Sequence, residues 1–290
     1  MKAVLVTGAS SGIGRMLAES LGRNGFLVFA GARVPEDLVS LGTLENVHPV
    51  RLDVTDQADI RSAVETVSKA NCSLYALVNN AGIVTLGPLI DGDDAEFELT
   101  LAVNLRGSYL VTRAFGPAIV KEQGRIINIG AVAGTLANVN VGAYSISKHG
   151  IEAFTDCLAA EVEPFGVKVS IIEPGSFKSR IGVNACQRKP GLSTLLPDFS
   201  SYREPIEVVS AVWHALTSDQ PKRRYLVVPD AAAAGRVIRK QILRLMQLNE
   251  GHTHTFSRDE LVSMLDVSLS ATNSASESVV HDGANRRGVT

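Results

Sequence analysis

The sequence predicts an α/β fold in which a parallel sheet of seven strands carries helices on both faces. Short apolar runs alternate with longer helical patterns over most of the 290 residues. Most of the short runs are apolar on successive residues, which is typical of strands buried on both faces of a parallel sheet. Strands and helices that follow in turn favour one doubly wound domain with right-handed crossovers.

Seven apolar runs are the strand candidates, and helical patterns separate them. The strands are expected at Ala3–Thr7, Leu27–Ala30, Val47–Leu52, Ala76–Asn79, Arg125–Ile129, Lys168–Ile172 and Tyr225–Val228. The clearest helices are expected at Gly14–Asn24, Asp56–Lys69, Glu96–Val120, Tyr144–Glu163 and Glu207–Ser218. No linker is evident before about residue 265, so we expect one domain over residues 1–266.

Two regions fall outside this alternation. Ser179 to Tyr202 has no clear period, and a loop of that length is usually functional or disordered, so a substrate loop is expected at about 179–205. A helical extension is expected at about 231–266. Residues 267–290 are rich in Ser, Asn and charge, which favours a disordered tail.

Composition excludes several classes of function. The formal net charge of −2 gives no electrostatic reason to expect nucleic acid or an anionic membrane as partner. No apolar run approaches the ~18 residues that an integral membrane helix needs. The strand-like start leaves no room for a signal peptide. The cysteines Cys72, Cys157 and Cys186 lack metal-ligand spacing, so we expect reduced thiols, no metal site and a soluble, cytoplasmic protein.

A glycine-rich turn joins the first strand to the first helix. Glycines at a helix N-terminus leave backbone N–H groups free to point at a pyrophosphate, and the helix dipole adds to the attraction. The alternative is tight packing of the turn, but its place in the first β-turn-α unit favours a dinucleotide. The residues of the turn expected at the cofactor are Gly8, Ser10, Ser11, Gly12, Ile13 and Gly14.

The end of the second strand bears on the choice of dinucleotide. An acidic residue there usually holds the ribose hydroxyls of NAD, whereas an arginine suits the extra phosphate of NADP. This strand ends in Ala32-Arg33 with no acid. A solvated surface arginine is the alternative interpretation of Arg33, but the missing acid favours NADP(H) over NAD(H).

Tyr144 and Lys148 lie at i and i+4, on one face of a helix. A free tyrosine has a pKa near ~10, and a neighbouring ammonium stabilises the phenolate and lowers that pKa. Such a tyrosine can give a proton to a carbonyl oxygen or remove one from an alcohol. Taken alone, most pairs of this kind are surface neighbours without a function.

Six motifs occur in order along the chain: the glycine turn at 7–14, Asp53-Val54, Asn79-Asn80-Ala81-Gly82, Asn104, Tyr144 with Lys148, and Pro174-Gly175. Together, over roughly residues 2–230, they resemble the short-chain dehydrogenase/reductase family in that family's order. The extended C-terminal part resembles the hydroxysteroid and retinol dehydrogenase-like members more than the shortest members. The resemblance implies a Rossmann-type domain.

The resemblance also implies roles for these residues. Asp53 and Val54 would border the adenine, and Asn80, Ala81 and Gly82 would line the nucleotide cleft. Pro174, Gly175 and Ser179 would lie beside the nicotinamide. Lys148 would bond the nicotinamide ribose while Tyr144 acts as general acid or base, and Asn104 would support a water-linked proton relay to Lys148.

One position departs from the family's pattern. The family places a serine thirteen residues before the tyrosine, where it hydrogen-bonds the substrate oxygen, and this chain has Ala131 there. By analogy with oxyanion-hole donors, the loss could cost on the order of 10²–10³ in rate. Three explanations are open: an engineered replacement, a natural alanine with another hydroxyl or a water in place of the serine, and lost chemistry. Because Asn104, Tyr144 and Lys148 remain, the first two explanations are favoured.

The resemblance places a substrate pocket around the segments after Gly82, at Val132–Val141 and at Ser179–Tyr202. Their mostly apolar side chains favour a hydrophobic alcohol or ketone, although the same residues could be core. These side chains are Val84, Leu86, Leu136, Val139, Leu195, Leu196 and Tyr202.

Helical segments suggest partners as well. The amphipathic run Arg236–Leu248 could bind a membrane surface. The favoured interpretation is a helix that packs over the substrate mouth or against a partner subunit. In the family, helices equivalent to Glu96–Val120 and Tyr144–Glu163 form the subunit interface, so a homodimer or homotetramer is expected.

The leading hypothesis is therefore an enzyme that transfers a hydride between NADP(H) and a carbonyl or secondary alcohol of a small, apolar substrate. The alternative is a non-catalytic NADP(H)-binding sensor or regulatory protein that has lost the catalytic serine. Ala131 favours the alternative, whereas Tyr144, Lys148 and Asn104 favour the enzyme.

Overall fold

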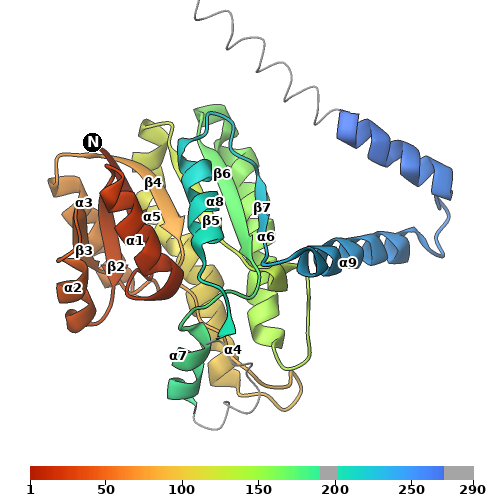
Figure 1. Ribbon diagram of the computed structural model, residues 1–290, viewed down its shortest axis with the longest axis horizontal. Helices are drawn as coiled ribbons and strands as arrows, with labels where there is room; N and C mark the ends of the chain where they lie inside the picture. Colours follow the sequence, from red (N-terminus) through yellow and green to blue (C-terminus); the bar gives the residue numbers. More distant parts are fainter. Residues whose placement is uncertain (190–200, 271–290) are drawn as a thin grey trace, which may run out of the picture. The chain divides into compact units, whose positions relative to one another are not determined.

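In the computed structural model, which describes residues 1–189 and 201–270, seven strands form one parallel sheet (Figure 1). The strand order is β3-β2-β1-β4-β5-β6-β7, so the crossover direction reverses beside β1. The strands are β1 (Lys2–Val6), β2 (Leu27–Ala32), β3 (Val47–Arg51), β4 (Ser73–Asn79), β5 (Arg125–Ile129), β6 (Lys168–Pro174) and β7 (Arg224–Val227). The expected seven-stranded parallel sheet of a Rossmann-type domain is confirmed.

Both faces of the sheet are buried, as the unbroken apolar runs predict. In β1, Val4 and Val6 belong to one core cluster, whereas Ala3 and Leu5 belong to the other. All four side chains are fully buried. Successive residues of a strand point to opposite faces, so a strand between two cores is apolar at every position.

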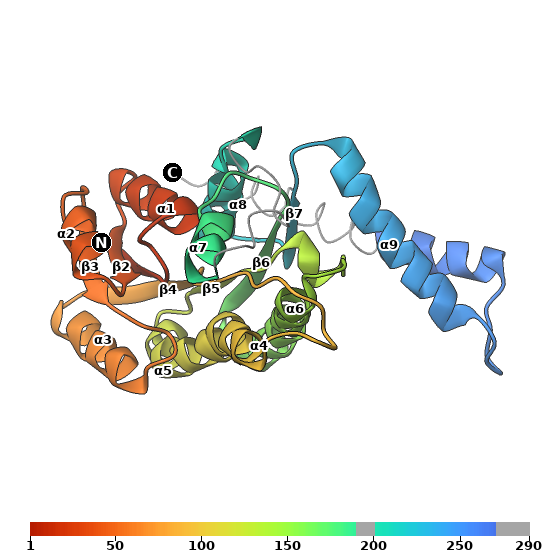
Figure 2. The same cartoon turned by 90° about the horizontal axis from the view of Figure 1, so that it is seen from below.

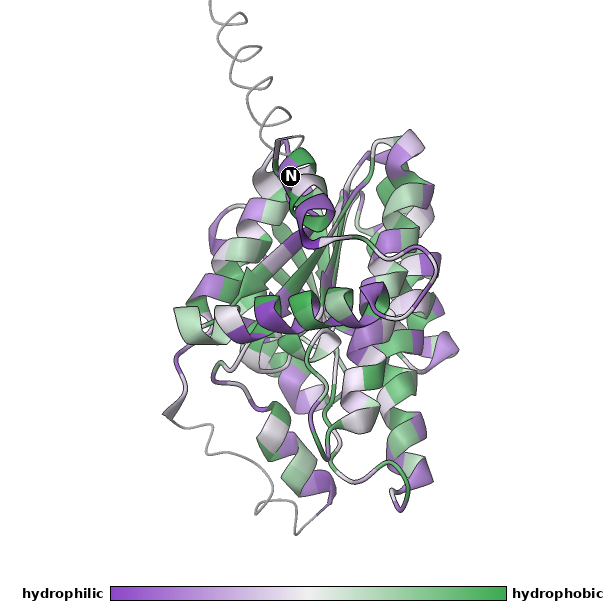
Figure 3. Cartoon of the chain, turned by 90° about the vertical axis from the view of Figure 1, so that its right-hand side faces the viewer, coloured by the Kyte–Doolittle hydropathy of each residue, from purple (hydrophilic) through white to green (hydrophobic). Residues whose placement is uncertain are grey.

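Helices cover each face of the sheet (Figure 2). One face carries α1 (Gly12–Arg23), α2 (Pro35–Leu41) and α8 (Ile206–Thr217). The other carries α3 (Gln57–Lys69), α5 (Ser108–Lys121) and α6 (Gly142–Val162). Figure 3 shows the strands of the sheet mostly in hydrophobic colours between helices that alternate in hydropathy.

The segment Glu96–Val120, expected to be one α-helix, is interrupted by a π-helical segment. It starts as α4 (Asp94–Leu101), passes through a π-helical segment at Ala102–Gly107 and continues as α5. The Asp93 carboxylate caps α4 by accepting hydrogen bonds from the backbone N–H groups of Ala95 and Glu96. A π-helical turn often marks a functional position, and Asn104 lies in this one.

Two further helices were not expected from the sequence. α2 has seven residues, too few for a helical period to be recognised. α7 (Ile181–Arg188) lies within the segment Ser179 to Tyr202, so the expectation of no regular structure throughout that segment is wrong. Its buried residues are the small Gly182 and Ala185, which give almost no apolar signal.

The chain divides into two compact units, Met1–Ile238 and Arg239–Thr290, and the boundary lies within α9 (Ala231–Asn249). In the second unit, residues 258–270 are helical. Every residue predicted to form the site lies in the first unit. The domain boundary at 266 stays a prediction, and the predicted tail lies mostly outside the described residues. No helix in the described ranges is both long and apolar enough to cross a membrane.

Candidate active site

A cavity of about 240 Å³ lies at the carboxyl ends of the parallel strands. It is lined by every predicted site residue except Asn104. These are Gly8, Ser10, Ser11, Gly12, Ile13, Gly14, Arg33, Asp53, Val54, Asn80, Ala81, Gly82, Ala131, Tyr144, Lys148, Pro174, Gly175 and Ser179. The fold thus brings together residues that are far apart in the chain, because parallel strands end at the same edge of the sheet.

The glycine turn is tightly packed against the end of β4. A Cβ atom on Gly14 would lie 2.4 Å from both the Gly8 carbonyl oxygen and Asn80 Nδ2. The Asn80 side chain donates hydrogen bonds to the carbonyls of Thr7 (2.9 Å) and Gly8 (3.0 Å). Gly8 has φ +62° and its Cβ would meet the Ala81 backbone. Glycine is therefore required for packing, and the same close approach keeps side chains out of the turn.

Arg33 and Asp53 stand at one end of the cavity. Arg33 Nη1 lies 3.5 Å from Asp53 Oδ2, and the Arg33 side chain is 63% exposed. Burial raises the pKa of Asp53, but hydrogen bonds from Thr55 and the charge of Arg33 outweigh burial and leave that pKa below its usual value. An anionic group that reaches this end of the cavity meets one cation and one fixed carboxylate.

Tyr144 and Lys148 occupy the first turns of α6 at the other end of the cavity. Lys148 Nζ donates a 2.7 Å hydrogen bond to the Ile129 carbonyl and lies 5.7 Å from the centre of the Tyr144 ring. The expected lowering of the Tyr144 pKa by the ammonium is wrong for this structure, because burial raises that pKa to about 12. Burial lowers the pKa of Lys148 to about 8, against the opposing effect of Glu152. At neutral pH the tyrosine is thus a proton donor beside a protonated lysine.

Asn104 lies behind the cavity wall and holds two elements together. Its Oδ1 accepts from the Ile83 N–H (2.8 Å), and its Nδ2 donates to the Ile83 carbonyl (2.9 Å). The same Nδ2 donates to Ser147 Oγ (2.9 Å), which donates to the Tyr144 carbonyl (2.7 Å). Ser147 is fully buried and was missed, because a serine in a helix has no distinguishing sequence signal. The predicted water-linked relay stays a prediction.

Ala131 lies at the end of β5 with an extended backbone (φ −172°, ψ 161°) and is 7% exposed. It lines the cavity with Tyr144, so the position without a hydroxyl is part of the site. A methyl group there can neither donate to nor accept from a substrate oxygen.

A second cavity, of about 380 Å³, adjoins the first, since Gly175 lines both. Leu136 and Tyr202, two of the expected substrate-lining residues, are on its wall. Val139 is 88% exposed and lines neither of these two cavities, so the structure does not place it on either wall. Leu195 and Leu196 lie outside the described residues.

Several lining residues were not predicted. Most come from segments that follow strands or from the α7 region, and Val103 comes from the π-helical segment. They include Gly31, Ala32, Leu52, Ile83, Val103, Gly130, Phe177, Arg180, Ile181 and Asn184. The residues of α7 could not be placed because the helix itself was not expected. Position near the carboxyl end of a strand is the signal that could have identified most of the others.

The family model described as short chain dehydrogenase matches residues 2–189. The chain is 34% identical over 261 residues to mitochondrial D-beta-hydroxybutyrate dehydrogenase of Rattus norvegicus, covering 77% of this chain and 76% of the relative. It is 34% identical over 253 residues to retinol dehydrogenase 5 of Mus musculus, covering 77% and 79%.

Solved structures share the fold. A short-chain dehydrogenase from Streptomyces avermitilis superposes with a TM-score of 0.71 at 28% identity, over 86% of this chain and 97% of that one. A variant of actinorhodin polyketide ketoreductase, solved with NADPH, has a TM-score of 0.71 at 27% identity, over 78% and 95%.

Proposed function

The chain belongs to the short-chain dehydrogenase family of oxidoreductases, and on that premise we propose that it transfers a hydride between NADP(H) and a carbonyl or secondary alcohol. The observation that carries this proposal is a single cavity lined by both the glycine turn and the Tyr144–Lys148 pair. A dinucleotide held by the turn would thus have its reactive end beside a proton donor.

The residues at the cavity fit such a cofactor. Glycine is required sterically in the turn, which keeps side chains away from a pyrophosphate. Arg33 is largely exposed at the cavity wall and can bind a 2′-phosphate, while the neighbouring Ala32 offers no carboxylate to repel one. The ketoreductase of similar fold was solved with NADPH, which agrees with this preference.

When bound, the nicotinamide supplies or accepts the hydride. Tyr144 donates its phenolic proton to the carbonyl oxygen during reduction and takes one from the alcohol during oxidation. The buried ammonium of Lys148 stabilises the resulting phenolate, because opposite charges attract strongly where water is excluded. Asn104 and Ser147 hold the first turn of α6, and hence the Tyr144 backbone, in place.

Ala131 slows this reaction without abolishing it. Tyr144 and Lys148 supply the proton and the positive charge, but the substrate oxygen lacks one preorganised hydrogen bond. We therefore propose an enzyme whose turnover is limited at this position.

The apolar part of the second cavity favours a small, apolar substrate. Its wall includes Val132, Leu136, Val228 and Val237 beside the charged residues Arg203, Asp230 and Arg236, and it adjoins the first cavity at Gly175. Retinol dehydrogenase 5 is among the similar proteins, and retinol is an apolar alcohol.

A non-catalytic NADP(H)-binding sensor is the second candidate, and Ala131 is the observation that favours it. The two candidates share the cofactor site and differ in turnover. Calorimetric titration with NADPH and NADH, together with a turnover screen against apolar ketones and alcohols, separates them. Binding of NADPH at least about tenfold tighter than NADH, with turnover, supports the enzyme. Binding without turnover supports the sensor, and no binding of either dinucleotide rejects both.

Subunit association and location are further parts of the proposal. We propose a homodimer or homotetramer through α5 and α6, where Tyr109 (47% exposed) and Ile146 (44% exposed) offer apolar surface. Light scattering on the purified protein tests this association. We also propose a cytoplasmic location, which fractionation of expressing cells tests.

A further inference from the structure

We propose that Arg188 is a positioning residue that holds α7 across the cofactor cavity by binding the Val84 backbone and the Glu96 carboxylate. This inference depends on the function proposed above and extends it to residues that do not line the cavity. It concerns α7 and the segment Ile83–Thr85, which both lie within the described ranges.

α7 begins at the cavity. Ile181 and Asn184 line the cavity wall, and so does Arg180, which precedes the helix. The Arg180 backbone nitrogen lies 3.8 Å from where a Cβ atom on Gly12 would be, so the helix starts next to the glycine turn. A displacement of α7 would therefore open one side of the cavity.

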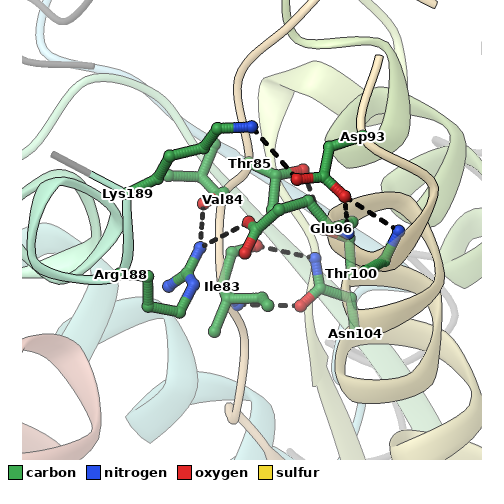
Figure 4. Close-up of polar contacts among 10 residues, drawn as sticks. Ile83, Val84, Thr85, Asp93, Glu96, Thr100, Asn104, Arg188 and Lys189 are labelled. Carbon is green, nitrogen blue, oxygen red and sulfur yellow. Dashed lines mark hydrogen bonds and ion pairs between the residues drawn. The ribbon is translucent and has the colours of Figure 1, made fainter. Parts of the chain in front are cut away.

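The other end of α7 is bound by Arg188 (Figure 4). Its Nη2 donates a 2.7 Å hydrogen bond to the Val84 carbonyl and lies 3.5 Å from Glu96 Oε2. Glu96 belongs to the first turn of α4, so the guanidinium connects α7 both to α4 and to the segment that follows β4. The contact with Val84 spans 104 positions of the sequence.

The segment bound by Arg188 is also the one that Asn104 binds. Three consecutive residues are each held by a different element, as Figure 4 shows. Asn104 of the π-helical segment bonds both backbone groups of Ile83, and Arg188 bonds the Val84 carbonyl. Thr85 Oγ1 lies 2.8 Å from Thr100 Oγ1 of α4. The position of α7 is thereby connected through one stretch of backbone to the residue that supports the Tyr144 turn.

Polar contacts dominate the attachment of α7, because its apolar contribution is small. Its buried residues are Gly182 and Ala185, while Val183 is 46% exposed. The side chains of Arg188 and Glu96 are only 25% and 21% exposed. Within the described residues, Arg188 Nε and Glu96 Oε2 are buried without a hydrogen-bond partner. Removing either charge leaves the other partly buried without its partner, which weakens the attachment of α7.

Lys189, the next residue, provides a matched control. Its Nζ lies 3.1 Å from Asp93 Oδ2, but both side chains are nearly half exposed, at 44% and 43%. Exposed pairs contribute little because water screens the charges and the side chains lose entropy. Lys189→Gln therefore removes a cation from the same end of α7 without removing a buried contact.

The test compares Arg188→Met, Arg188→Lys, Glu96→Gln and the Arg188→Met/Glu96→Gln double variant with Lys189→Gln. Hydrogen exchange of residues 181–188 is measured without cofactor, and the dissociation of NADPH is measured by stopped-flow fluorescence. In Arg188→Met we expect both rates to rise about tenfold or more, since a hydrogen bond from a charged donor is lost. In Arg188→Lys both rates should rise less than in Arg188→Met. In Lys189→Gln both rates should equal those of the wild type.

The double variant separates the two contacts of Arg188. Its exchange rate and its NADPH dissociation rate should rise by less than the two single variants predict together, because the added Glu96→Gln change removes the carboxylate that Arg188→Met alone would leave partly buried and unpaired. Wild-type rates in Arg188→Met would overturn the inference, as would faster exchange spread over the strands of the sheet. If the wild type binds no dinucleotide, the proposed function fails, and exchange in the cofactor-free protein still decides whether Arg188 holds α7.

Discussion

The guanidinium of Arg33 lies 3.5 Å from the carboxylate of Asp53, and both residues line the same end of the cavity. At this distance the contact is a loose ion pair on a largely exposed side chain, so it contributes little by itself. A phosphate offers the guanidinium two parallel hydrogen bonds and more negative charge. Arg33 is thus available to a 2′-phosphate.

Replacing Arg33 or the preceding Ala32 should change cofactor selectivity. In Arg33→Ala we expect NADPH affinity to fall about tenfold or more with little change for NADH, because only NADPH carries the phosphate. Ala32→Asp should weaken NADPH and strengthen NADH, because a carboxylate repels the phosphate and accepts from ribose hydroxyls. Calorimetric titration with each dinucleotide measures both effects. If Arg33→Ala lowers the affinities for NADPH and NADH equally, Arg33 does not recognise the 2′-phosphate.

A hydroxyl at position 131 should raise turnover. Ala131 lines the cavity with Tyr144, so Ala131→Ser adds a donor on the wall where the substrate oxygen would react. We expect turnover to rise by on the order of 10²–10³, the value of one oxyanion-hole donor. Steady-state kinetics on a ketone substrate measures the gain.

Ala133→Ser is the matched control for this substitution. Ala133 lies two residues away in a short 3-10 helix and does not line the cavity. It should leave turnover unchanged. A protein that binds NADPH but shows no turnover with either alanine or serine at position 131 would instead be a sensor.

Carbonyl reduction should slow as the pH rises through about 8. Burial lowers the pKa of Lys148 to about 8, so the ammonium is present below that pH and lost above it. Tyr144, with its pKa raised to about 12, keeps its proton over the whole range. A plot of log kcat/KM against pH from about 6 to about 10 should therefore be level and then fall.

Lys148→Arg tests the assignment of this pH dependence. A guanidinium stays protonated throughout the range, so the fall should disappear even where the overall rate is lower. If the fall persists near pH 8 in this variant, another group causes it.

Methyl groups at two glycines should have opposite effects on stability. A Cβ on Gly14 would lie 2.4 Å from the Gly8 carbonyl oxygen, so Gly14→Ala should lower Tm by roughly 2–10 °C and abolish dinucleotide binding. Gly235 lies within α9, and a Cβ there would meet no atom of another element within 4 Å. Gly235→Ala should raise Tm by roughly 2–4 °C. Differential scanning calorimetry measures both, and an unchanged Tm in Gly14→Ala would contradict the packing argument.

The sheet and its order of elements could be predicted from the amino-acid sequence alone. Residues such as Ala3, Val4, Leu5 and Val6 are all apolar because a strand between two helical layers is buried on both faces. The glycine turn and the Tyr144–Lys148 pair were equally predictable, since each lies within a few residues of chain and has a local physical reason.

Which distant residues meet could be established only from the three-dimensional arrangement. Ser147 and Asn104 are 43 positions apart, and Arg188 and Val84 are 104 apart, yet each pair is joined by a hydrogen bond. No local periodicity encodes such contacts, because they depend on where each turn and helix end lies in space. α7 shows the same limit, since its buried face consists of Gly182 and Ala185 and is held in place by charged and backbone groups from other elements.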